Sequence, residues 1–161
     1  MKRWLFCLIS VLSLYCGFVK ADTFGVAGAA YVKGDFAQVV TLLRPLAEKG
    51  NSEAQYKLGV MYDEGKGVVQ DYKEASKWYR LSAEQGKPSA QYNLGVMYAQ
   101  GQGVSQDNVR SHMWLSLAVA QGFNEAQNDR DWLAQRMTPA QIAEAQKMTR
   151  KCKKSNFKNC N

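Results

Sequence analysis

The sequence predicts an all-α fold, an αα-hairpin solenoid in which short helical hairpins stack in register. Three observations lead to this fold class. A 36-residue unit occurs twice without a gap, at 54–89 and 90–125, with 17 of its 36 positions identical. Each unit holds two stretches with apolar residues at helical spacing, separated by a glycine-rich loop. Helices this short are marginal alone, so the hairpins must bury their apolar stripes against each other.

The first half of each unit predicts an amphipathic helix. Its apolar residues from Ala54 to Tyr62 fall at i, i+4, i+7 and i+8 on one stripe. Glycine is unfavourable inside a helix, so we expect Gly59 and Gly95 to permit close approach of the partner helix. The glycine pairs at 65–67 and 101–103 then end this helix, because glycine adopts the left-handed conformation without a Cβ clash.

The second half of each unit predicts a helix with an acidic N-cap. Asp71 is followed three residues later by Glu74, the arrangement of a capping box. The second copy keeps Asp107 but has Arg110 at the third position, so half of the box remains. Trp78 and Trp114 mark this second helix, which we expect to end at Gly86 or Gly122.

Partial units flank the two full repeats. Residues 24–53 predict a degenerate hairpin whose second helix should be kinked at Pro45. Residues 126–151 begin a third copy and close it with Thr138-Pro139-Ala140-Gln141, which combines an N-cap, a first-turn proline and a capping-box glutamine. The predicted closing helix runs from Pro139 to about Lys151, so the whole solenoid is expected over 22–151.

The first 21 residues predict a secretory signal peptide. A cationic start at Lys2 and Arg3 precedes an apolar run from Trp4 to Val19, and small residues favour cleavage after Ala21. An uncleaved anchor is the alternative, but the run spans only about 24 Å as a helix, less than the hydrocarbon core. We therefore expect a periplasmic or secreted protein.

The C-terminal residues 152–161 predict a basic tail closed by a disulfide. The chain carries a formal charge of +7, yet residues 22–146 hold 12 basic and 14 acidic side chains. The excess positive charge lies in the signal and in the last fifteen residues. Cys152 and Cys160 are the two cysteines left after signal cleavage, and export favours their pairing over intermolecular bonds, free thiols, or redox or metal chemistry.

The repeat motif resembles the Sel1-like repeat, a relative of the tetratricopeptide repeat. Both copies carry A-Q-Y-x-L-G-V-M-Y-x-x-G-x-G-V-x-Q-D, at 54–71 and 90–107, followed by a tryptophan and a closing Gln-Gly. With partial units the resemblance covers about 28–150. It departs from the family at Pro45, at Arg110 and in the third copy, which lacks the glycine loop. The resemblance implies a right-handed superhelix and an adaptor, scaffold or ligand-binding role in the cell envelope or outside the cell.

The sequence predicts no enzyme, no cofactor and no metal site. His112 is the one histidine, and a lone histidine on a repeat helix is more often a solvent-facing or packing residue than a catalytic base. The adjacent carboxylates Asp63 and Glu64 are replaced by Ala99 and Gln100 in the next unit, which indicates a solvated helix end. A hydrolase acting on cell-wall material is kept as a weaker alternative.

Binding is the better-supported function, through a surface that we call the first-helix row. In αα-solenoids the first helix of each hairpin usually lines the concave face, and tyrosine and tryptophan among polar groups are typical of protein interfaces. Packing between hairpins is the competing interpretation of the shared Tyr56, Tyr92 and Val60. The first-helix row consists of Tyr56, Lys57, Val60, Asp63, Tyr92, Asn93, Val96, Gln100 and Trp132.

The expected ligand of this row is a protein or peptide. A second predicted surface is the basic segment 147–158, which suits an anionic lipid or polysaccharide surface through weak contacts. A frayed, solvated terminus is the alternative for that segment. We expect no nucleic-acid partner, because an exported protein does not share a compartment with DNA or RNA.

Overall fold

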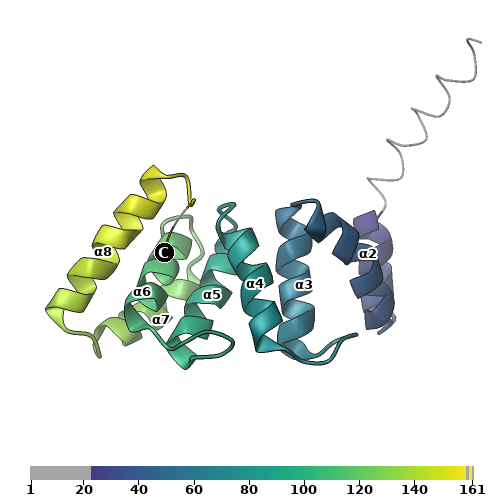
Figure 1. The fold of residues 1–161 in the computed structure, drawn as a ribbon, viewed down its shortest axis with the longest axis horizontal. Helices are drawn as coiled ribbons and strands as arrows, with labels where there is room; N and C mark the ends of the chain where they lie inside the picture. The colour runs from purple at the N-terminus through teal and green to yellow at the C-terminus, as the bar shows by residue number, and fades with distance from the viewer. Residues whose placement is uncertain (1–22, 159, 161) are drawn as a thin grey trace, which may run out of the picture.

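The computed structural model describes residues 23–158 and Cys160, and the predicted signal peptide lies outside the described residues. The described chain is all-helical and elongated, with successive helices arranged along the long axis (Figure 1). A helical segment at 23–32 is followed by seven helices. These are α2 (Phe36–Glu48), α3 (Ser52–Glu64), α4 (Tyr72–Ala83), α5 (Pro88–Gln100), α6 (Asn108–Val119), α7 (Glu125–Ala134) and α8 (Pro139–Lys154). The predicted fold class is confirmed.

Two sets of helices alternate along the chain. The first helices of the hairpins are segment 23–32, α3, α5 and α7, and the second helices are α2, α4, α6 and α8. Each helix from α2 to α6 packs on the next in sequence, and α6 contacts both α7 and α8. Three apolar clusters follow one another along the array, one under each pair of neighbouring hairpins. Each hairpin therefore buries apolar side chains against its neighbours as well as between its own two helices.

Gly59 and Gly95, which lie inside the first helices, are closely packed against the partner helix, as expected. The nearest atoms of the partner helix belong to a side chain. A Cβ on Gly59 would lie 2.6 Å from the Tyr79 ring of α4, and a Cβ on Gly95 would lie 2.9 Å from Leu115 of α6. The partner helix therefore inserts a large side chain against each glycine.

The loop glycines end the first helices as predicted. Gly65 and Gly101 are the C-caps of α3 and α5, both with φ in the left-handed region. A Cβ on Gly67 would lie 2.3 Å from the carbonyl oxygen of Phe36, so the loop rests on the start of α2. Gly103 meets Tyr72 of α4 in the same way. These contacts hold each hairpin loop against the preceding second helix.

The caps of the second helices are confirmed with one correction. The Asp71 carboxylate accepts hydrogen bonds from the Lys73 and Glu74 amides, and Asp107 accepts from the Arg110 amide. The Glu74 side chain does not complete a capping box, because it pairs with Lys77 instead. The box at α8 is complete, with Thr138 and Gln141 bonded reciprocally.

The two ends of the array differ in detail from the expectation. α2 runs from Phe36 to Glu48 with Pro45 inside it and on its exposed side, so the proline does not end the helix; the kink stays a prediction. At the other end, α8 continues to Lys154, and its buried Cys152 lies in the central apolar cluster. No helix in the described part of the chain is long and apolar enough to cross a membrane.

Candidate binding face

The glutamines that both repeats share form hydrogen bonds to carbonyl groups at the ends of neighbouring helices. The buried Gln55 side chain donates to the Ala47 carbonyl at the end of α2, and Gln91 donates to Ala83 at the end of α4. Each glutamine also accepts a hydrogen bond of 2.6 Å, Gln55 from Gln85 and Gln91 from Gln121. Helix ends carry unpaired carbonyls, so these residues satisfy groups that burial would otherwise leave unbonded.

The same pattern covers the ends of the first helices. Gln70 donates to the Asp63 carbonyl at 2.7 Å, and Gln106 donates to the Ala99 carbonyl at 2.8 Å. The repeated Gln-Asp pair thus closes one helix and caps the next. The side chains of these shared glutamines are therefore occupied by contacts within the scaffold.

The first-helix row lies on α3, α5 and α7, and its members have three different surroundings. Tyr56, Lys57 and Val60 line a cavity at the N-terminal end of the row. Val96, Gln100 and Trp132 line a second cavity at the other end. Asp63, Tyr92 and Asn93 lie outside both cavities; Asp63 and Tyr92 form hydrogen bonds to neighbouring side chains, and Asn93 lies close to Tyr79.

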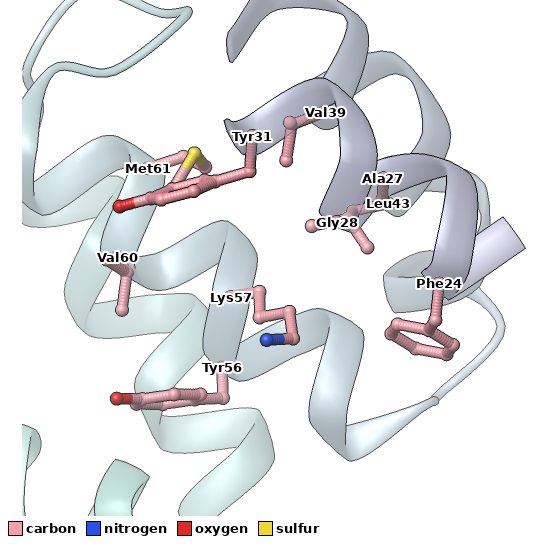
Figure 2. Close-up of a pocket in the computed structure, with 10 residues that line it drawn as sticks. All are labelled: Phe24, Ala27, Gly28, Tyr31, Val39, Leu43, Tyr56, Lys57, Val60 and Met61. Carbon is pink, nitrogen blue, oxygen red and sulfur yellow. The ribbon is translucent and has the colours of Figure 1, made fainter. Parts of the chain in front are cut away.

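The first cavity has a volume of about 290 Å³ and lies between segment 23–32, α2 and α3 (Figure 2). Its wall is mostly apolar: Phe24 and Tyr56 lie at one end, and Tyr31 and Met61 at the other. Lys57 provides the one cationic group of the lining, which comprises Phe24, Ala27, Gly28, Tyr31, Val39, Leu43, Tyr56, Lys57, Val60 and Met61.

The Lys57 ammonium is already paired with a neighbouring carboxylate. Glu53 lies 3.2 Å from Lys57 and 2.5 Å from Lys87, whose ammonium also lies 5.3 Å from the centre of the Tyr56 ring. Burial raises the pKa of Glu53, but the hydrogen bonds from Lys87 and Lys57 outweigh that effect and hold the pKa below its ordinary value. This corner of the face therefore stays ionised, and its two ammonium groups and one carboxylate leave one net positive charge.

The second cavity has a volume of about 200 Å³ and lies between α5 and α7 over Leu115 of α6. Its lining is Val96, Ala99, Gln100, Leu115, Asp129, Trp132 and Leu133. Trp132 is 55% exposed, and the Arg136 guanidinium stacks 3.6 Å from its ring centre. An exposed indole held by a stacked arginine is an arrangement often found at protein interfaces.

A polar group separates the two cavities. The Tyr79 hydroxyl of α4 donates to Asp63 at 3.1 Å and lies close to the Asn93 side chain of α5. Burial raises the pKa of Asp63, partly opposed by the Tyr79 hydrogen bond. Burial and the Asp63 charge raise the pKa of Tyr79 well above its ordinary value, so the phenol stays protonated and keeps donating.

Two residues that the sequence analysis did not select control this face. Tyr79 and Leu115 occupy the same place in the two units, as do Asp63 and Ala99. The tyrosine–aspartate pair of one unit is thus replaced by a leucine–alanine pair in the next. Aligning the two units displays this paired change, and it is the signal by which the sequence identifies the floor of the face.

His112, which the sequence analysis judged not to be catalytic, and the predicted disulfide also have defined surroundings. His112 is buried in α6, with its Nδ1 3.3 Å from the Ser116 hydroxyl, so it packs inside the array. Cys152 and Cys160 form a disulfide with a Cα–Cα distance of 4.8 Å. The loop that this disulfide closes places Phe157 against Gly86 and the central apolar cluster. The described part of the tail is therefore packed and not frayed.

Comparison with known proteins identifies the repeat. A family model described as Sel1 repeat matches residues 52–87 and 88–123. The crystal structure of c5321, a protective antigen of uropathogenic Escherichia coli strains that displays an SLR fold, is similar with a TM-score of 0.80 and 26% identity. It covers 87% of this chain, which spans 31% of the antigen. No curated relative matches the sequence.

A second solved structure agrees. The crystal structure of a Sel1 repeat protein from Oxalobacter formigenes has a TM-score of 0.63 and 32% identity. The match covers 67% of this chain and 44% of that protein. The chain therefore spans less than half the length of either structure.

Proposed function

Because the chain is a Sel1 repeat protein, we propose that it is a non-catalytic scaffold that binds a protein or peptide through the first-helix row. Sel1 repeats generally mediate protein–protein interactions, and this fold is typically a scaffold without catalysis. One observation carries the proposal: the two cavities at the ends of the row are lined by six of its nine residues. The signature residues, in contrast, are occupied in bonding helix ends.

The test compares two triple variants in affinity capture from envelope extract. Tyr56→Ala, Asn93→Ala and Val96→Ala together alter the row. Lys33→Ala, Lys73→Ala and Gln146→Ala alter three exposed positions away from it. We expect the row variant to lose the partner that wild-type protein captures, while the control retains it. Equal capture by both folded variants, with folding checked by circular dichroism, would contradict the proposal.

The second candidate function is contact with an anionic surface through α8. The side chains of Lys147, Arg150, Lys151, Lys153, Lys154 and Lys158 are exposed, while Ala145 and Cys152 of the same helix are buried. The helix therefore presents cations to solvent and its small apolar residues to the core. Each basic residue near an anionic membrane surface contributes about 1 kcal/mol.

Vesicles containing phosphatidylglycerol test this candidate. Lys147→Gln, Lys151→Gln and Lys154→Gln remove three charges while leaving Cys152 in the core. The matched control removes three exposed charges elsewhere, at Lys33, Lys49 and Lys73. We expect salt-sensitive binding that only the α8 variant loses. Equal loss in both variants would attribute the attraction to net charge and contradict a role for α8.

The proposed compartment is the periplasm or the medium, with the signal removed. The cationic start and apolar run of the first 21 residues support this proposal. Mass spectrometry of the protein recovered from the envelope should find an N-terminus at Asp22. A chain that retains Met1 would contradict cleavage.

A further inference from the structure

One position of the 36-residue period places a side chain of the second helix beneath the space between neighbouring first helices. We call the side chains at this position the floor of the face. Leu43 of α2, Tyr79 of α4 and Leu115 of α6 are spaced by 36 residues. Leu43 lines the first cavity and Leu115 lines the second. Tyr79 instead places its ring against Gly59, with its centre 6.0 Å from that of Tyr56. The face therefore alternates an apolar cavity, a polar centre and a second apolar cavity.

The polar centre and the rim of the second cavity carry unneutralised carboxylates. Asp63 is bonded to the Tyr79 hydroxyl, and Asp129 accepts a hydrogen bond of 2.9 Å from the Tyr92 hydroxyl. Within the described residues neither carboxylate takes part in an ion pair. The nearby Glu53 pairs with both Lys57 and Lys87, so that cluster keeps one positive charge against the two negative charges of Asp63 and Asp129. A cationic ligand group between the two cavities would therefore meet uncompensated negative charge.

We propose that the face binds an extended peptide with two apolar side chains and a basic residue between them; this rests on the proposed function. The apolar side chains enter the two cavities, and the basic side chain meets Asp63. The cavities lie two helix spacings apart, about 16–20 Å at the usual 8–10 Å between packed helices. An extended chain advances about 3.3 Å per residue, so the two apolar residues are five or six positions apart.

The probe is a set of fluorescein-labelled synthetic peptides. Each contains two phenylalanines in a glycine–serine background, separated by three to eleven positions, with arginine or glutamine midway between them. We expect the tightest binding at a separation of five or six, with the arginine form preferred. An optimum near eleven, the separation that a helical ligand would need at 1.5 Å per residue, would overturn the proposal.

Variants of the floor make the test specific. Leu115→Tyr with Ala99→Asp transfers the residues of the central unit to the second cavity and fills it. We expect at least tenfold weaker binding of the best peptide, the loss typical of an interface anchor. Leu81→Tyr on α4 is the matched control, since Leu81 is exposed and lines neither cavity. Equal affinity of the floor variant and the control, both folded by circular dichroism, would overturn the proposal.

The role of Asp63 in recognising the basic residue of the peptide is tested by a separate measurement. Asp63→Asn keeps an acceptor for the Tyr79 hydroxyl while removing the charge, so the preference for arginine over glutamine should fall at least fivefold. An unchanged preference would overturn the role of Asp63. If peptides of every separation bind equally and the row variant abolishes them, the proposed function stands and this inference fails. If the row variant binds all probes as wild type does, the proposed function fails too.

Discussion

His112 is a buried imidazole whose neutral form is favoured by the fold. Burial lowers its pKa, the Arg130 charge lowers it further, and Asp131 partly opposes both. Between its folded pKa and the ordinary value near 6.5, the unfolded chain binds more protons than the folded chain. Stability is therefore retained above pH 6.5 and is lost as the pH falls through that window.

The test replaces His112 with serine, the residue that the preceding unit has at Ser76. We expect the melting temperature of wild-type protein to fall more steeply between pH 7 and pH 5 than that of His112→Ser, because the other groups titrate in both proteins. Calorimetry at several pH values measures the two slopes. Parallel slopes would show that His112 contributes nothing to the acid sensitivity.

Gly59 is the residue on which the close packing of Tyr79 depends. An added methyl group would lie 2.6–2.7 Å from two ring carbons of a fully buried side chain. We expect Gly59→Ala to lower the free energy of unfolding by about 1–3 kcal/mol, the usual cost of overpacking. Urea denaturation followed by circular dichroism measures the change.

Gly28 provides the matched control for that substitution. It lies in segment 23–32, and nothing is within 4 Å of the place where its Cβ would be. Gly28→Ala should therefore stabilise the protein by up to about 1 kcal/mol through helix propensity alone. If Gly59→Ala were as stable as Gly28→Ala, the close contact at Tyr79 would be wrong.

At the scale of the helices, the buried glutamines connect one hairpin to the next. Gln55→Leu removes the hydrogen bond to Ala47 and one of the two acceptors of Gln85, which keeps the Leu81 carbonyl, so the free energy of unfolding should fall by about 1–3 kcal/mol. Gln127 occupies the same position of the partial third copy and is exposed. Gln127→Leu should change stability by less than about 0.5 kcal/mol. Equal effects in chemical denaturation would contradict this role of Gln55.

The C-terminal turn depends on its disulfide. In the chain-entropy model, a loop as short as that closed by Cys152 and Cys160 contributes about 2–3 kcal/mol. Cys160→Ser should therefore lower stability by that amount, and dithiothreitol should lower the stability of wild-type protein but not of the variant. Peptide mapping without reduction should recover the linked pair. A wild-type melting temperature unaffected by dithiothreitol would contradict the contribution.

The helices were predictable from the sequence because their boundaries depend on local chemistry. The glycine caps at 65 and 101, the aspartate caps at 71 and 107, and the box at Thr138 each act within one turn of chain. The effect of a proline depends on its neighbours, and here α2 continues through Pro45 to Glu48, so the proline does not end the helix. The missing bond of Glu74 has the same origin, since Lys77 competes for its carboxylate.

The candidate binding face was less predictable, because it depends on contacts between elements. The first-helix row was chosen from one helix of each hairpin. The depth of the face is controlled by Leu43, Tyr79 and Leu115, which come from the other helix. Whether Tyr79 reaches the face depends on the glycine opposite it, and only the packed structure shows that Tyr79 meets both Gly59 and Asp63.

At the scale of the whole molecule, stability should vary along the array. Hairpins in the middle pack against neighbours on both sides, and α4 to α6 surround the largest apolar cluster. Segment 23–32 has a neighbour on one side in the described chain and should open first. Hydrogen exchange should therefore show the greatest protection around Leu94 and Trp114 and the least in 23–32. Uniform protection would indicate that the array opens as a single unit.

The shared glutamines bond helix ends, whereas the residues at positions 43, 79 and 115 shape the candidate binding face. This difference affects how related proteins should be grouped. Alignments weighted toward the shared motif group proteins that build the same framework, because those side chains bond helix ends. Sorting by the residues equivalent to 43, 79 and 115 would instead group proteins by the shape and polarity that they offer to a ligand. Under the proposed function, exchanging leucine and tyrosine at one such position should change the preferred ligand without changing the architecture.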